Sequence, residues 1–297
     1  MPSPDAGRTA SLAEHALAWA ELLRLPALFT VPGDALAGAT ATAPAPSART
    51  LLAIGSSLCL YEAGMALNDW SDREEDALER PHRPLPSARI HPAAAFSAAC
   101  ALTGAGLALA ARAGRPALAV AAPLAATVWA YDLGLKRTPA GPAAMAAARG
   151  LDLLLGAAAT TGHPRRALPS AALLATHTLA VTAVSRRETT DGSPLAPLAA
   201  LATTGVLTHL LTRRPAPKAA LRSALGAAYA VTAARPYAHA ALNPSPQLTQ
   251  RAVGSGVRAT IPLQAALAAR SGARSTAVLV AVLAPLGRRF ARTVSIT

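Results

Sequence analysis

A series of long apolar runs restricts what this chain can fold into more than any other feature of its sequence. A helix needs about 20 mainly apolar residues to cross a bilayer, and the run from Pro92 to Ala111 contains no charged residue. We expect membrane spans over residues 16–41, 51–67, 92–111, 116–135, 141–161, 168–185, 195–212 and 219–242. Residues 253–269 and 276–286 form either two further spans or one span and a surface helix, so the sequence predicts about nine helices.

The composition and the pattern of these runs favour membrane helices over other fold classes. Only 14% of the residues are charged, whereas a soluble domain carries about 25%. The runs also lack the period-two alternation of membrane strands. We therefore expect an all-α, polytopic membrane helical bundle, with a single domain over residues 1–297 and a flexible N-terminus over residues 1–14. Pro26 and Pro32 are expected to kink the first span.

The net charge of +13 narrows the range of partners. Nucleic acid is excluded as a partner, because the arginines are scattered between apolar runs and aromatic residues for base stacking make up only 3% of the chain. Two interpretations of the positive charge stay open. Basic loops can lie beside anionic lipid, or the cations can belong to a site for a polyanionic substrate.

The densest group of acidic residues follows directly after the apolar run over 51–67, in the stretch NDWSDREEDALERPHRPLP. Asn68, Asp69, Asp72 and Asp76 have spacings that put them on one face of a helix, where like charges repel one another. Such a face is tolerated in open water or around a cation. Hard oxygen ligands suit Mg2+, which takes one or two carboxylates together with substrate phosphates.

Basic residues follow this acidic group at once. Arg80 and Arg83 can bind phosphate oxygens in a bidentate manner. The stretch is thus typical of a site for Mg2+ and a diphosphate at the end of a membrane helix. The alternative is a solvated acidic helix end followed by a basic loop, which is how we interpret Glu74, Glu75 and Glu79.

Three stretches resemble one known family, the UbiA superfamily of intramembrane prenyltransferases. NDWSDREEDALERPHRPLP resembles its first Asp-rich motif, NDxxDxxxD. YDLGLKRTPAGPAAMAAARGLDLLLGAA is similar to its YxxxLKR loop and the helix that follows, with Asp152 where Asn is common, and LLRLPALFTVPGDALAGA is similar to its first helix. The later stretch GSGVRATIPLQAALAARSG is similar to the EboC-like branch of the superfamily.

The resemblance implies a bundle of nine transmembrane helices around a central cavity that opens sideways to lipid. It further implies a multi-pass protein of the cell membrane, with two acidic motifs that hold Mg2+ and an isoprenoid diphosphate on the cytoplasmic side. The implied reaction is transfer of the prenyl group to a small acceptor, in specialised metabolism or lipid-quinone-like biosynthesis. The oligomeric state is not implied.

Two alternative functions stay open beside prenyl transfer. One is a UbiA-type terpene cyclase, although such a site needs aromatic walls to shelter a carbocation and this chain has only three Phe, three Trp and four Tyr residues. The other is a non-catalytic membrane carrier that retains the fold. Its main support is the second acidic motif, which departs from the pattern of the family.

That second motif is expected in SRRETTDG, where only Glu188 and Asp191 are acidic. These two residues are three apart and can share a helix face, so they are candidate catalytic residues and Mg2+ ligands together with the Asn68 group. Arg187 stands four residues before Asp191, and it can bind diphosphate directly in place of one Mg2+. The alternative is an ordinary loop beside the membrane.

Several other polar residues lie in or beside the expected spans, where ionisable groups are functional candidates. Lys136 and Arg137 can form a diphosphate clamp or contact lipid headgroups. Tyr131 lies near the end of the fourth span at a position similar to one in the family, but an aromatic residue at the membrane interface is an equally good interpretation. Arg149 and Asp152 are spaced i, i+3 and are expected to pair, either as structural support or with Arg149 directed at the diphosphate.

Two further acidic residues lie deeper in the expected spans. Glu62 precedes Asp69 by seven residues, so it should point the same way two turns deeper in the membrane. There it can contact the acceptor, hold a cation or remain a buried protonated acid. Asp34, beside Gly33, either shapes an acceptor pocket or caps a helix at a kink.

Overall fold

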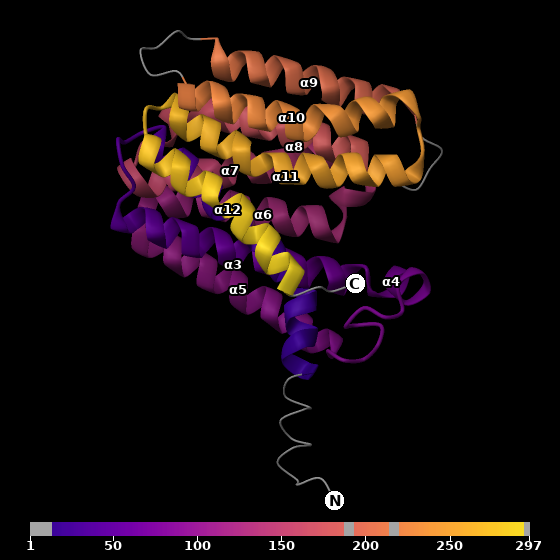
Figure 1. Ribbon diagram of the computed structural model, residues 1–297. Coiled ribbons are helices and arrows are strands. Elements are labelled where there is room, and N and C mark those ends of the chain that lie inside the picture. Colours follow the sequence, from indigo (N-terminus) through magenta and orange to yellow (C-terminus); the bar gives the residue numbers. More distant parts are fainter. Residues whose placement is uncertain (1–13, 187–192, 214–219, 294–297) are drawn as a thin grey trace, which may run out of the picture.

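The computed structural model describes residues 14–186, 193–213 and 220–293, and every regular element in these segments is helical. The prediction of an all-α fold is therefore confirmed (Figure 1). Residues 1–13, which contain nearly all of the expected N-terminal tail, lie outside the described residues, as do Arg187, Glu188 and Asp191.

The elements follow one another along the chain with short connections. After a helix over residues 14–22 come η1 (Leu25–Thr30), α2 (Pro32–Thr40), α3 (Ala48–Ser71), α4 (Arg73–Glu79), α5 (Pro92–Ala113), α6 (Arg115–Leu133), η2 (Leu135–Arg137), α7 (Gly141–Thr161), η3 (Pro164–Ala167), α8 (Leu168–Ser185), α9 (Leu195–Thr212), α10 (Ala220–Leu242), α11 (Pro246–Arg270) and α12 (Arg274–Thr293).

Six segments of the described chain are long and apolar enough to cross a membrane, namely α3, α5, α6, α7, α9 and the segment Pro164–Ser185. α10 and α11 have the length of a span, but α11 buries polar side chains inside the bundle, among them Thr249, Ser255 and Gln264. Such residues lower the mean hydropathy of a helix without exposing it to water. The chain thus has the helices of a multi-pass membrane protein, and the number of nine spans stays a prediction.

The first expected span is divided into three helices, as its prolines predicted. Arg24 adopts a left-handed conformation (φ 49°) between the helix over 14–22 and η1. Pro26 lies within the first turn of η1, and Pro32 begins α2. Because proline lacks a backbone N–H and fixes its own φ, each position interrupts a continuous α-helix.

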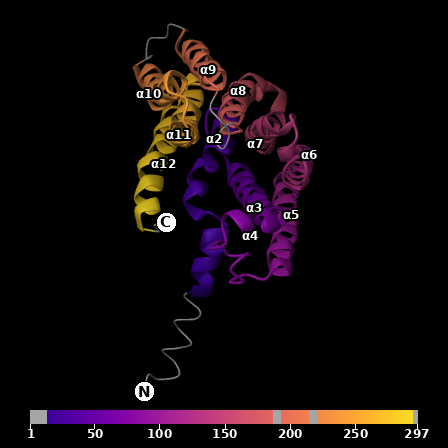
Figure 2. The ribbon, with the colours of Figure 1, turned by 90° about the vertical axis from the view of Figure 1, so that its right-hand side faces the viewer.

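The last part of the chain forms two separate helices joined by a turn at Gly272, whose φ of 87° favours glycine. α12 packs against α11, η1 and α2, and it crosses obliquely in front of the bundle in Figure 1. In Figure 2, α3, α5, α6 and α7 lie on one side of α2, whereas α10, α11 and α12 lie on the other. α2 is thus the central element on which both groups of helices meet.

Two glycines allow α2 and α7 to approach each other closely. A Cβ atom added to Gly38 in α2 would overlap the backbone oxygen of Leu153 in α7, and one added to Gly156 in α7 would overlap the backbone of Ala35 in α2. Small residues at helix crossings let backbones meet in this way in membranes. Buried Leu36, Ala37 and Leu153 belong to the largest apolar cluster.

We expect Gly156→Val to destabilise the fold strongly, because the added side chain has to separate α2 from α7. Overpacking of this kind should lower the midpoint of thermal unfolding in detergent by about 10 °C. Gly104→Val is the matched control, since a Cβ atom on Gly104 in α5 would meet no atom of the described residues within 4 Å. Equal midpoints for the two variants would contradict close α2–α7 packing.

Candidate functional site

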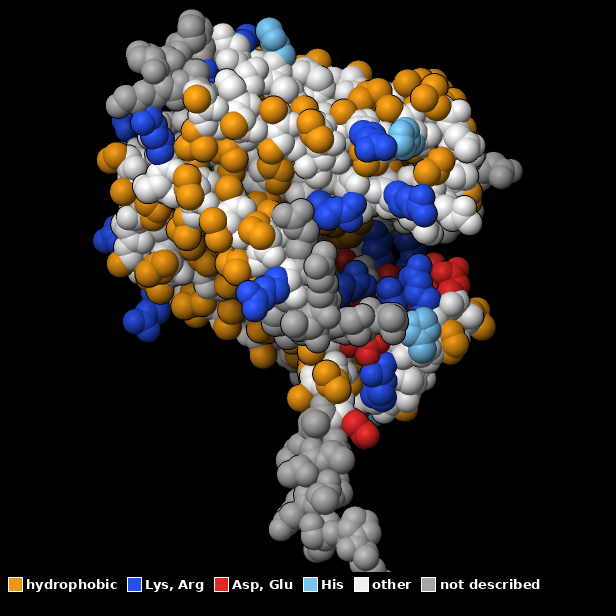
Figure 3. Space-filling view, viewed as in Figure 1, with side chains coloured by type: hydrophobic (Ala, Val, Ile, Leu, Met, Phe, Trp, Pro, Cys, Tyr) orange, Lys and Arg blue, Asp and Glu red, His pale blue; other side chains and the backbone are white. Residues whose placement is uncertain are grey.

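Charged side chains gather at one end of the bundle. Figure 3 shows Lys, Arg, Asp and Glu side chains in and around a hollow on one side of the molecule, while hydrophobic side chains cover much of the rest of that face. A cavity of about 320 Å3 lies there, between α3, α6 and α7. Its polar lining includes Arg24, Asn68, Asp132, Arg149 and Asp152.

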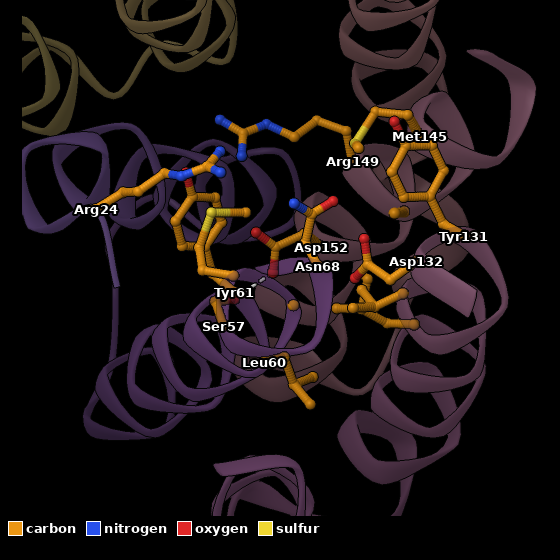
Figure 4. Close-up of a pocket in the computed structure, with 15 residues that line it drawn as sticks. Arg24, Ser57, Leu60, Tyr61, Asn68, Tyr131, Asp132, Met145, Arg149 and Asp152 are labelled. Atoms are coloured by element: carbon orange, nitrogen blue, oxygen red, sulfur yellow. Dashed lines mark hydrogen bonds between the residues drawn. The ribbon is translucent and has the colours of Figure 1, made fainter. Parts of the chain in front are cut away.

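The side chains enter this cavity from different elements (Figure 4). The guanidinium groups of Arg24 and Arg149 lie on one side, Tyr131 and Asp132 lie on the other, and Asn68 lies between them. Apolar side chains from the same helices make up most of the remaining lining: Leu60, Leu124, Val128, Met65 and Met145. The cavity therefore combines charged and polar side chains with a largely apolar lining.

The acidic motif lies where α3 passes into α4. The α-helix stops at Ser71 and resumes at Arg73, and Asp72 adopts φ −95° and ψ 4° between them. Hydrogen bonding of the helical type continues through this turn, since Asp72 N donates to Asn68 O (3.0 Å) and Asp76 N donates to Asp72 O (2.8 Å). The expected helical spacing is therefore kept, but across the end of α3 and the short helix α4 rather than on one straight helix.

Two of the three aspartates are buried and held by arginines. Asp69 Oδ1 lies 3.0 Å from Nη2 of Arg24 and 3.7 Å from Nη1 of Arg83. Asp76 pairs with Arg83 at 2.6 Å and with Arg80 at 3.3 Å. Arg83 thus bridges the two carboxylates, and the structure brings both predicted arginines into contact with the acidic motif.

Asp72 is paired from another direction, by the loop between α6 and α7. Its Oδ1 atom lies 2.8 Å from Lys136 Nζ and 2.9 Å from Arg137 Nη2. Lys136 also donates to Asn68 Oδ1 (3.0 Å) and to Ser71 Oγ (2.7 Å). Its side chain is only 11% exposed, whereas that of Arg137 is 54% exposed. Lys136 is therefore the inner cation of the predicted clamp and Arg137 the outer one.

This arrangement fits a metal ion only in company with an anion. Within residues 14–186, 193–213 and 220–293, no three His, Cys, Asp or Glu side chains converge as metal ligands. Of the residues that the structure describes, five cations surround the carboxylates of Asp69, Asp72 and Asp76: Arg24, Arg80, Arg83, Lys136 and Arg137. The surplus of positive charge suits a polyanion, and the oxygen donors suit Mg2+ shared with its phosphates.

The expected ion pair between Arg149 and Asp152 is wrong. Arg149 Nε instead lies 2.9 Å from Oδ2 of Asp34, which is completely buried in α2. Asp152 accepts a hydrogen bond from the hydroxyl of Ser57 in α3. α2 and α3 both pack on α7. Arg149 and Asp152 therefore each contact a residue of a neighbouring helix instead of each other. Asp34 lies behind the cavity wall rather than in it, whereas Arg149 and Asp152 line the cavity.

The remaining predicted residues have different surroundings. Tyr131 lines the cavity. Glu62 is buried in α3 but is not among the lining residues, and neither of its carboxylate oxygens has a hydrogen-bond partner in the described part of the chain. A contact between Glu62 and an acceptor therefore stays a prediction. The proposed second acidic motif, with Arg187, Glu188 and Asp191, falls outside the described residues.

Sequence reasoning missed two charged residues of the cavity, Arg24 and Asp132. Both lie within expected membrane spans, in LLRLPAL and in YDLGLKR. A charged residue inside an apolar run is a functional candidate, so the signal for both was present. Ser57, Tyr61 and Met145 were missed as well, and no local sequence signal separates them from ordinary helix residues.

Comparison with known proteins gives one consistent family. A model described as the UbiA prenyltransferase family matches residues 27–193. A digeranylgeranylglyceryl phosphate synthase from Methanopyrus kandleri is 36% identical over 115 residues, which is 38% of this chain and 40% of that protein. Its counterpart from Methanothrix thermoacetophila is 37% identical over 112 residues, 37% of this chain and 42% of that protein. The chain thus matches about two fifths of the length of these curated relatives.

Solved structures extend the likeness to most of the chain at the level of the fold. A UbiA homologue from Aeropyrum pernix superposes with a TM-score of 0.66 at 18% identity, over 81% of this chain and 96% of that one. A homologue from Archaeoglobus fulgidus bound to GPP and Mg2+ superposes with a TM-score of 0.61 at 18% identity, over 87% of this chain and 99% of that one. The helical arrangement is thus shared with these proteins over most of the chain.

Proposed function

Because the chain belongs to the UbiA prenyltransferase family, we propose that it is an integral-membrane prenyltransferase that acts on an isoprenoid diphosphate together with Mg2+. One observation carries this proposal. Among the described residues, five cations surround three carboxylates beside a cavity with a largely apolar lining. That combination matches a ligand with a multiply charged head and a hydrocarbon tail.

The head of the substrate is assigned to the end of α3. Asn68, Asp69, Asp72 and Asp76 would provide the oxygen ligands for Mg2+, whose charge stabilises the departing diphosphate. Lys136, Arg137, Arg80 and Arg83 already lie within ion-pair distance of these carboxylates. When diphosphate enters, the same cations can contact its oxygens, which are more highly charged than a carboxylate.

The chemistry then needs a site that excludes water. The bond between the allylic carbon and the diphosphate oxygen breaks, and both electrons stay with the oxygen. The acceptor forms a bond to the carbon and loses a proton, which the departing diphosphate can accept. Leu60, Leu124 and Val128 keep water from the allylic cation during this step. Two aromatic residues, Tyr61 and Tyr131, are among the lining residues. Such a sparse aromatic wall favours transfer over cyclisation.

Further parts of the proposal extend beyond the described residues. Glu188 and Asp191 are assigned as ligands on the second acidic motif, with Arg187 as a further contact for diphosphate. The site is assigned to the cytoplasmic side of the membrane. The acceptor belongs to specialised metabolism or to lipid-quinone-like biosynthesis, and the name of the curated relatives adds a glyceryl phosphate lipid as a candidate.

The proposal is tested by product analysis with protein purified into lipid. Geranyl, farnesyl and geranylgeranyl diphosphates are each incubated with Mg2+ and a panel of quinone precursors, glyceryl phosphate lipids and cyclic polyols. We expect one prenylated acceptor and an equal amount of diphosphate. A cyclic hydrocarbon in place of a prenylated acceptor would identify a terpene cyclase, and binding without release of diphosphate would identify a carrier.

A further inference from the structure

Gln264 lies in α11, outside the segment that matches the family model, yet it reaches the back of the cavity wall. Its side chain is fully buried. Nε2 donates hydrogen bonds to Oδ1 of Asp34 (2.6 Å) and to the backbone oxygen of Thr30 (2.7 Å). Both partners are acceptors, so only the amide nitrogen can face them.

Arg149 uses the same two partners. Its Nε lies 2.9 Å from Oδ2 of Asp34, and its Nη2 donates to the backbone oxygen of Thr30 (3.2 Å). Gln264 and Arg149 therefore hold one carboxylate and one carbonyl in common. Of the four residues, only Arg149 lines the cavity, and Figure 4 shows its guanidinium on the same side of the cavity as that of Arg24.

We propose that Gln264 is a positioning residue, which holds Asp34 and Thr30 so that Arg149 presents its guanidinium to the diphosphate. This inference rests on the proposed function. A guanidinium is planar, with its donors in a fixed fork. Two of its nitrogens are engaged by Asp34 and Thr30, so the orientation of these partners determines where the rest of the group points.

Loss of the Gln264 amide would leave Arg149 itself unchanged but would alter the hydrogen bonding of its partners, Asp34 and Thr30. Without Gln264, the buried side chain of Asp34 loses a hydrogen-bond donor and keeps its ion pair with Arg149 and its contact with Asp152. A buried polar group needs such hydrogen bonds to offset the cost of removing it from water. The guanidinium would then be drawn toward Asp34 and Thr30 and away from the cavity.

Gly33 provides an independent way to disturb the same contact. A Cβ atom added to Gly33 in α2 would overlap Oε1 and Cδ of Gln264. Alanine is otherwise favourable in a helix, so a defect in Gly33→Ala cannot come from helix propensity. The inference thus predicts the same binding defect from variants in two different helices.

The test measures binding of inorganic diphosphate with Mg2+ to the full chain in lipid, for wild type, Gln264→Met, Gly33→Ala, Arg149→Met and the double variant Gln264→Met/Arg149→Met. We expect Gln264→Met and Gly33→Ala each to weaken binding about tenfold. The double variant should bind no more weakly than Arg149→Met alone, because Gln264 acts only through Arg149. Gln250→Met is the matched control, since Gln250 is exposed on the same helix.

The outcomes separate the positioning role from the proposed function. If wild type binds diphosphate and both Gln264→Met and Gly33→Ala bind it equally tightly, the positioning role is overturned and the proposed function stands. If the losses of binding free energy add up in the double variant, the positioning role is likewise overturned. Wild type without affinity for diphosphate would overturn both. Where Gln264→Met does not fold, the cycle of Gly33→Ala with Arg149→Met gives the same decision.

Discussion

Replacement of Asp72 by asparagine is expected to lower Mg2+-dependent release of diphosphate by about two to three orders of magnitude. Asp72 lies at the turn between α3 and α4, and its carboxylate is contacted by Lys136 and Arg137. Asparagine keeps the shape of the side chain but removes the charge that a metal ion needs. The measurement is the rate of diphosphate release from geranyl diphosphate at saturating Mg2+.

Glu74→Gln is the matched control for this change. Glu74 follows two residues later, its side chain is 88% exposed, and its ion pair is with Arg73, at 3.2 Å. An exposed pair of this kind contributes little, so release should stay within about twofold of wild type. An Asp72→Asn variant that keeps more than a tenth of the wild-type rate would show that Asp72 does not hold the metal.

The second large effect is expected at Lys136, where methionine should reduce release about a hundredfold. Lys136 contacts Asp72, Asn68 and Ser71 at 2.7–3.0 Å. Its side chain is largely shielded from water, so its charge acts on a bound diphosphate with little screening. Methionine preserves the apolar stem and removes only the ammonium group.

Arg137→Met tests whether this effect depends on position or on charge alone. Arg137 contacts the same Asp72 oxygen as Lys136, but its side chain is 54% exposed. Because water screens an exposed charge, we expect less than about a fivefold loss of release. Losses of equal size for Lys136→Met and Arg137→Met would contradict the assignment of Lys136 as the inner cation.

The membrane class and the place of the acidic motif could be predicted from sequence, because both depend on neighbours along the chain. Apolar runs of span length that lack period-two alternation form helices in a bilayer, and Pro26 and Pro32 divide the first of them as expected. The contact of Arg80 and Arg83 with the motif also follows from their short distance along the chain.

Contacts between distant helices could not be predicted in the same way. Arg149 was expected to pair with Asp152, three residues away, but it pairs with Asp34 in α2. Gln264 meets Asp34 across 230 residues, and nothing in its neighbourhood along the sequence indicates this. The number of spans also depends on packing, because α11 buries Thr249, Ser255 and Gln264 inside the bundle.

Mg2+ and the side chains of Asn68–Asp76 are proposed to act together on an isoprenoid diphosphate. The most direct test is whether the wild-type protein in lipid releases diphosphate from geranyl diphosphate. The rate is measured with Mg2+ and the acceptor panel, after chelation with EDTA, and after Mg2+ is added back. We predict release that falls to background on chelation and returns with Mg2+. Release that persists after chelation, or no release with any acceptor, would contradict this mechanism.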